Sequence, residues 1–144
     1  MESKEINTLL GAIYSHIHPY NTEMDKIDKE TFDLVDTLLE GVPYEGLIDK
    51  IYENSKQTDV RKIGILFDIL TWSTKDNGTY LFTQIATWVK GNNKKKLEIA
   101  LSVNDSFPLY PISELEKELK LVEKKFPDLR PMCEFWADCI KKKT

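Results

Sequence analysis

Few residues in this sequence have the type and spacing that a metal site or a disulfide requires. His16 and His18 are the only two histidines, and side chains two positions apart on a helix point to different faces. A helical pair of metal ligands needs a spacing of three or four residues, so we expect neither histidine to bind a metal. Cys133 and Cys139 would stand about 9 Å apart along a helix axis, beyond the usual disulfide span. We therefore expect two reduced thiols and no metal site.

The motifs of phosphate binding and nucleophilic catalysis are missing as well. No glycine-rich segment leads into the Lys-Ser or Lys-Thr pair of a phosphate-binding loop, and no Gly-x-Ser-x-Gly elbow occurs. The Glu-x-x-His pattern of a di-metal helical bundle is absent, and the carboxylates form no recognisable acid–base pair. The sequence therefore predicts a protein that is not an enzyme, has no catalytic residues and uses no cofactor.

The charges are divided unevenly between the two halves of the chain. The 144 residues include 24 acidic side chains and 20 Lys and Arg, for a net charge of −4. Residues 1–59 hold 13 acidic and five basic side chains, a net charge of −8, whereas residues 60–144 have a net charge of +4. This asymmetry indicates a charged partner, and the overall acidity argues against nucleic acid in that role. The lysine run at 94–96 is interpreted as a solvated helix start.

Acidic side chains gather on two consecutive predicted helices in the first half of the chain. Their spacing places Glu30, Asp33 and Glu40 opposite the apolar face of one helix, so stacked helices would form a contiguous negative surface. Such a surface speeds the capture of a basic protein, and two tyrosines nearby offer rigid rings with a hydroxyl. An ordinary solvated face is the alternative. The candidate partner-binding residues are Glu30, Asp33, Asp36, Glu40, Tyr44, Asp49, Tyr52 and Glu53.

Helical periodicity dominates the apolar residues, and segments that alternate as a strand would are scarce. We expect a single all-α domain over residues 1–144, with about eight helices whose short links make them antiparallel neighbours. The fourth helix is apolar nearly all round, so we expect it to be central. All three tryptophans, Trp72, Trp88 and Trp136, are expected in the core. The predicted helices cover about 4–17, a segment ending at 40, a segment starting at 43, 59–73, 80–91, 93–104, 113–126 and 128–143.

Local signals predict how several of these helices begin and end. Asp59 is expected to cap the fourth helix, and Ser113 with Glu116 has the pattern of a capping box. Gly41 is the expected left-handed stop of the second helix, and Pro43 the expected start of the third.

Residues 58–66, with the sequence TDVRKIGIL, resemble the opening of the second helix in a HEAT repeat. In that family an Asp-Val-Arg step precedes apolar and small residues: Asp caps the helix, Val enters the core and Arg reaches a neighbouring turn. Residues 93–104 would be the equivalent helix one unit later, where an Asn-Lys-Lys sequence replaces this step. The resemblance implies a HEAT-like stack of helical hairpins, and a compact helical bundle is the alternative.

The size, the helical pattern and the acidic surface together resemble a family of bacterial immunity proteins. These protect cells from contact-dependent growth inhibition toxins and other polymorphic toxins. In that family the protein binds its cognate toxin domain, commonly a nuclease, and blocks the active site or the access of substrate. Since nucleases carry basic clefts for phosphates, the resemblance implies that the acidic candidate residues cover such a cleft. The alternative is a helical adaptor or regulatory domain that binds peptide segments of a protein partner.

The remaining sequence features concern compartment and assembly. No stretch approaches the roughly 20 apolar residues of a membrane-spanning helix, so we expect no membrane partner. The segment MESKEINTLL has mixed charge and no apolar run, so we do not expect it to be a signal peptide. Two unpaired cysteines fit a reducing compartment, and we expect a cytoplasmic protein. The absence of a sustained heptad pattern leaves the oligomeric state open.

Overall fold

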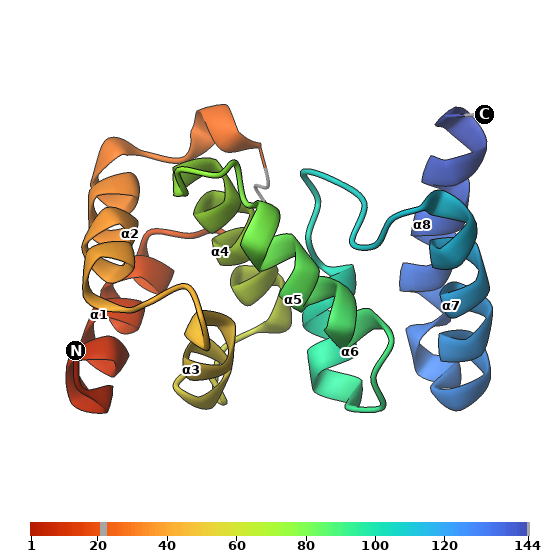
Figure 1. The fold of residues 1–144 in the computed structure, drawn as a ribbon, viewed down its shortest axis with the longest axis horizontal. Coiled ribbons are helices and arrows are strands. Elements are labelled where there is room, and N and C mark those ends of the chain that lie inside the picture. Colours follow the sequence, from red (N-terminus) through yellow and green to blue (C-terminus); the bar gives the residue numbers. More distant parts are fainter. Residues whose placement is uncertain (21–22, 144) are drawn as a thin grey trace.

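The computed structural model describes residues 1–20 and 23–143, and that part of the chain folds into helices without strands (Figure 1). The all-α class with about eight helices is therefore confirmed. Within the described residues, no helix is long and apolar enough to cross a membrane. The elements are α1 (Ser3–Ser15), the short 3₁₀ turn η1 (Met24–Lys26), α2 (Lys29–Gly41), α3 (Leu47–Glu53), α4 (Val60–Ser73), α5 (Thr79–Val89), α6 (Lys94–Leu101), α7 (Ile112–Lys125), the 3₁₀ turn η2 (Pro127–Leu129) and α8 (Arg130–Lys143).

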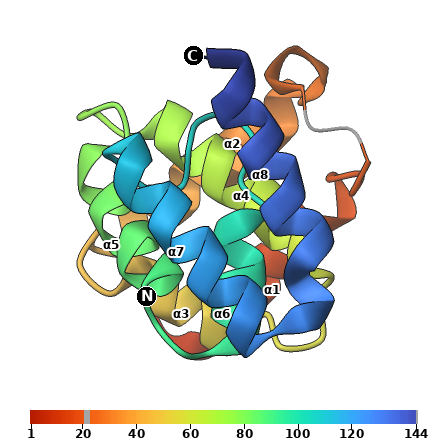
Figure 2. The ribbon, with the colours of Figure 1, turned by 90° about the vertical axis from the view of Figure 1, so that its right-hand side faces the viewer.

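Helices that are close in sequence pack against one another along the long axis of the molecule (Figure 1). The first helix packs on α2 and α3, α4 contacts α2, α5 and α6, and α7 pairs with α8. The α7–α8 pair covers the end that carries the C-terminus (Figure 2), and the N-terminus lies at the opposite end (Figure 1). The acidic first half of the chain therefore lies toward the end with the N-terminus, and the more basic second half extends from the centre of the molecule to the opposite end (Figure 1).

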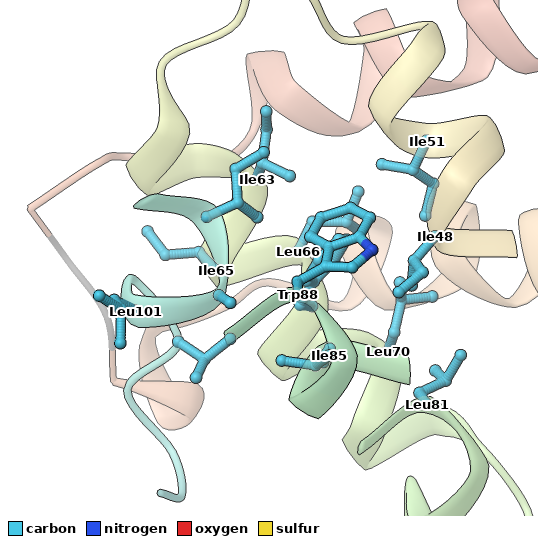
Figure 3. Close-up of a cluster of buried hydrophobic side chains, with 14 of the residues drawn as sticks. Ile48, Ile51, Ile63, Ile65, Leu66, Leu70, Leu81, Ile85, Trp88 and Leu101 are labelled. Atoms are coloured by element: carbon cyan, nitrogen blue, oxygen red, sulfur yellow. The ribbon is translucent and has the colours of Figure 1, made fainter. Parts of the chain in front are cut away.

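The fourth helix is the centre of the core, as predicted. Every residue from Ile63 to Thr71 is buried, because α2, α5 and α6 cover this helix on several sides. Gly64 allows the end of α6 to approach α4 closely, since a Cβ there would lie 2.7 Å from Cβ of Ser102 and 2.8 Å from its carbonyl oxygen. Figure 3 shows side chains of α4 among those of α3, α5 and α6, and the labelled residues are Ile48, Ile51, Ile63, Ile65, Leu66, Leu70, Leu81, Ile85, Trp88 and Leu101.

The structure confirms one predicted cap and corrects another. The Asp59 carboxylate accepts a hydrogen bond from the backbone N–H of Arg61 at 2.9 Å, so it caps α4 as expected. The capping box at Ser113 is wrong. The α7 helix already begins at Ile112, with the extended residue Pro111 in the capping position, and Ser113 is an exposed residue of the first turn. Proline fixes an extended approach to the helix here, which moves its start ahead of the serine.

Two predicted boundaries around the third helix are also wrong. Gly41 is the last residue of α2 but does not have the left-handed conformation, which among the described glycines belongs to Gly46 and Gly78. Its missing side chain instead makes room for Met1, whose Cε would lie 2.3 Å from a Cβ at this position. The next helix begins at Leu47 rather than at Pro43, because Gly46 at φ 77° turns the chain immediately before it.

The tryptophans do not share one environment. Trp88 and Trp136 are 7% and 3% exposed, as predicted for core residues, and the Trp136 indole donates to the carbonyl of Leu101 at 2.9 Å. Trp72 is 61% exposed, so the prediction of burial is wrong there. This residue belongs to the last turn of α4, where the helix emerges from its neighbours, and its indole N–H donates to the Asp105 carboxylate.

Candidate partner-binding surface

The outer face of α2 carries the four acidic residues that were predicted for it. Glu30, Asp33, Asp36 and Glu40 are all exposed, and they are spaced by three or four positions along the helix. Apolar and small side chains of the same helix, such as Val35, are buried on the opposite side. The amphipathic pattern of α2 therefore fixes which of its side chains face solvent.

A hollow of about 500 Å³ lies between α2 and the turn that joins α4 to α5. We call it the acidic hollow. Its walls include the carboxylates of Asp36, Glu40 and Asp76, the half-buried ring of Tyr44 and one ammonium group, that of Lys75. The backbone N–H of Tyr80 donates to Asp76 at 3.1 Å and lowers the pKa of its carboxyl, so this group stays ionised. Three carboxylates against one ammonium give the hollow an excess of negative charge.

The beginning of α2 has a different environment. Nδ1 of His16 lies 3.3 Å from the Asp28 carboxylate, and its Nε2 lies 3.7 Å from Glu30. Asp33 lies 3.9 Å from the ammonium of Lys29 on the same helix. These are exposed pairs, which contribute little to stability and leave all three carboxylates accessible. His16 thus lies beside the carboxylates at the start of α2.

Two of the three candidate residues on α3, Asp49 and Tyr52, lie beside lysines, although Asp49 is still exposed. Asp49 Oδ1 lies 3.8 Å from Nζ of Lys96, and the same ammonium lies 5.1 Å from the ring centroid of Tyr52. The ammonium groups of Lys56 and Lys95 lie 5.9 and 6.0 Å from this ring. Lys95 also donates to the carbonyl of Lys56 at 2.8 Å. Part of the lysine run at 94–96 thus packs against α3, which the interpretation as a solvated helix start missed.

The structure therefore divides the eight candidate residues. Asp36, Glu40 and Tyr44 share the acidic hollow, Glu30 and Asp33 extend it along the outer face of α2, and Glu53 is exposed on α3. Asp49 and Tyr52 belong to the mixed-charge contact between α3 and α6. The acidic hollow also takes Asp76 from the α4–α5 turn, a segment in which sequence reasoning had assigned no candidate residue.

Sequence reasoning also missed a second hollow on the far side of the same turn. This hollow, of about 310 Å³, is lined by Thr71, Trp72, Asn77, Phe82, Asp105 and Ser106, and we call it the tryptophan hollow. The available signal was the position of Trp72 at the very end of an apolar helix, next to a polar turn. A side chain in such a place is covered only if another element crosses the helix end.

One buried carboxylate lies beneath these surfaces. Asp68 is 4% exposed and accepts backbone N–H bonds from Asn104 at 3.0 Å and from Asp105 at 3.3 Å. Burial raises the pKa of Asp68 to about 7, although both hydrogen bonds favour the ionised form. Its role is to attach the loop after α6 to α4. Within the described residues, no group of three or more His, Cys, Asp and Glu could hold a metal ion.

Comparison with known proteins assigns no family to this chain. No family model, no curated protein and no solved structure matches it. The resemblances to HEAT hairpins and to bacterial immunity proteins therefore stay predictions, and the function has to be inferred from the surface itself.

Proposed function

We propose that this protein is an immunity protein, which binds a cognate toxin domain through the outer face of α2 and neutralises it. A basic nuclease is the class of toxin that this surface fits best. The observation that carries the proposal is the convergence of Asp36, Glu40 and Asp76 on one open hollow beside the exposed carboxylates of α2.

The electrostatic argument concerns the rate and the specificity of association. A nuclease must hold phosphates, so its substrate cleft carries lysine and arginine side chains. A surface of opposite charge attracts that cleft over about one Debye length, roughly 8 Å at physiological salt, and raises the association rate. An inhibitor seated on the cleft then excludes the nucleic acid, whose charge has the same sign as the acidic hollow.

The tyrosine in the hollow adds an apolar contact to this charge attraction. Tyr44 is half-buried, so its ring is held in place by the protein while one part stays accessible. Tyrosine is enriched among the residues that dominate binding energy, because a rigid ring covers a large area at a small entropic cost. We expect Tyr44 to contact the partner between the charged groups.

The alternative function, an adaptor that binds peptide segments, is favoured by another hollow, which is apolar. An apolar hollow of about 330 Å³ lies where α6 and its following loop meet α8, and its wall includes Leu101, Val103, Met132 and Phe135. Phe135 is 48% exposed. A peptide with an apolar side chain would fit this hollow, and it would bind there with little dependence on salt or on the charges of α2.

The test is affinity capture from the source cell lysate by three immobilised forms of the protein. These are the wild type, the charge-reversal variant Asp36→Lys/Glu40→Lys, and a control variant Glu116→Lys/Asp138→Lys that changes the net charge equally on α7 and α8. We expect the wild type and the control to retain one basic protein that high salt releases, and the α2 variant to lose it. The captured domain should also lose its nuclease activity when the wild-type protein is added.

Two results would contradict the proposal. Equal retention of the same protein by both variants would show that the charges of α2 do not form the contact. Retention of several unrelated proteins, resistant to salt and lost on substitution of Phe135 by Ser, would support the adaptor function instead.

A further inference from the structure

The tryptophan hollow presents the one indole that the described core leaves outside. Trp72 is 61% exposed, whereas Trp88 and Trp136 are 7% and 3% exposed. Phe82, on α5, lines the same hollow and is half-buried. An exposed tryptophan keeps a large apolar area out of the core, and tryptophan is strongly enriched among residues that dominate binding interfaces.

The exposed ring is nevertheless held in a defined orientation. Its indole N–H donates to the carboxylate of Asp105, which comes from the loop after α6. The backbone N–H of Asp105 donates in turn to the buried carboxylate of Asp68 at 3.3 Å, and Asp68 precedes Trp72 by one turn of α4. The loop is thus attached to α4 twice, and Trp72 and Asp105 are fixed as a pair. A partner that binds this pair loses less conformational entropy than it would with a mobile side chain.

The chemistry of the pair selects a cation. An indole face attracts a guanidinium or ammonium group through its quadrupole, and a neighbouring carboxylate adds a charge-assisted hydrogen bond. Asp105 is the one charged residue among those that line the hollow, so no described lysine or arginine there opposes a cation. Arginine fits better than lysine, because its planar group can stack on the ring while its N–H groups reach the carboxylate.

From this geometry we infer that the tryptophan hollow binds an arginine side chain of a protein partner, with Trp72 stacking on the guanidinium and Asp105 accepting its hydrogen bonds. Asp68 is a positioning residue, since it touches Asp105 and not the hollow. The occupant is chosen by charge complementarity, and the volume of about 310 Å³ has room for an arginine side chain.

The position of the hollow connects it with the acidic hollow. The turn between α4 and α5 separates the two: Lys75 and Asp76 line the acidic hollow, while Trp72 and Asn77 line the tryptophan hollow. A partner on the outer face of α2 can therefore reach over this turn and place an arginine beside Trp72. The arginine site adds a second contact to the proposed function. It rests on that function in one respect, namely that the partner is a basic protein.

The test observes Trp72 directly, without the natural partner. The indole N–H signals of the three tryptophans are followed by NMR during titration with acetyl-Gly-Arg-Gly-amide, and Trp72→Phe assigns the signal. The matched probe is acetyl-Gly-citrulline-Gly-amide, which has nearly the same shape but no charge. We expect a saturable shift of the Trp72 signal with the arginine peptide only. In Asp105→Asn, which can still accept the indole N–H, the affinity should fall about fivefold or more.

The outcomes separate this inference from the proposed function. Equal shifts with citrulline, an unchanged affinity in Asp105→Asn, or no saturable shift of Trp72 would each overturn the inference, provided the variant keeps its thermal midpoint. Asp36→Lys/Glu40→Lys should retain the arginine-dependent shift. If that shift is present while no basic domain is captured, the proposed function fails and the inference stands. If a basic domain is captured through α2 while Trp72 does not respond to arginine, only the inference fails.

Discussion

Replacing Asp68 with asparagine measures the balance between burial and hydrogen bonding at the one buried carboxylate of α4. The side chain is 4% exposed and accepts backbone N–H groups of Asn104 and Asp105 at 3.0 and 3.3 Å. Burial is the largest influence on its pKa and raises it from 3.8 to about 7, and the carboxylate of Asp105 acts in the same direction. The two backbone hydrogen bonds lower the pKa but do not outweigh burial.

The direction in which stability changes with pH follows from the pKa of Asp68 in the folded and in the unfolded protein. In the unfolded chain Asp68 loses its proton near its ordinary pKa of 3.8, whereas the folded protein keeps it until about pH 7. Between these limits the folded state binds more protons, so this group makes the protein less stable as the pH rises. Each pKa unit corresponds to about 1.4 kcal/mol, so between pH 5 and pH 8 the loss from Asp68 is about 2.5 kcal/mol.

Urea denaturation of the wild type and of Asp68→Asn at pH 5 and pH 8 tests this value. We expect the stability of the wild type relative to the variant to fall by about 2–3 kcal/mol between the two pH values. Asp138→Asn, on the exposed side of α8, is the matched control and should follow the wild type at both pH values. A difference between wild type and Asp68→Asn that changes by less than about 0.5 kcal/mol would refute the reasoning, since it would mean that the carboxylate is ionised throughout.

Two further predictions concern the close contact of α4 and the thiols of α8. Gly64→Ala should destabilise the protein by about 1–3 kcal/mol in urea denaturation, because the new Cβ meets the backbone of Ser102, although alanine is the better helix former. Gly11→Ala is its control in α1, where a Cβ meets nothing within 4 Å, and it should raise stability by about 0.5–1 kcal/mol. Iodoacetamide at pH 8 should label half-buried Cys139 at least about tenfold faster than buried Cys133, whose pKa burial raises to about 11, and equal rates in mass spectrometry would contradict this.

Helix positions and the central place of α4 could be predicted from the sequence because both depend on local periodicity. A helix that is apolar on all sides must be covered on all sides, and the run from Ile63 to Thr71 is buried as this argument requires. The outer face of α2 was predictable for the same reason. Val35 and Leu38 mark the side of the helix that is buried, so Asp36 and Glu40 lie on the side that faces solvent.

The errors lie where a residue depends on an element far away in the sequence. Trp72 is apolar and continues the pattern of α4, yet the elements in the described part of the chain leave it 61% exposed at the end of that helix. Asp49 and Tyr52 look like part of the acidic surface until α6 brings Lys96 to both. Asp76 looks like a turn residue until its turn is seen to close the acidic hollow opposite α2.

The sequence by itself determined the class of fold, the helix that occupies the core and the acidic side chains that stay outside, because each follows from the order of apolar and polar residues along one helix. Tertiary structure alone decided which charges meet, which tryptophan is left uncovered and which turn separates the two hollows. Those properties depend on distances between residues of different helices, and the spacing along the chain does not contain them.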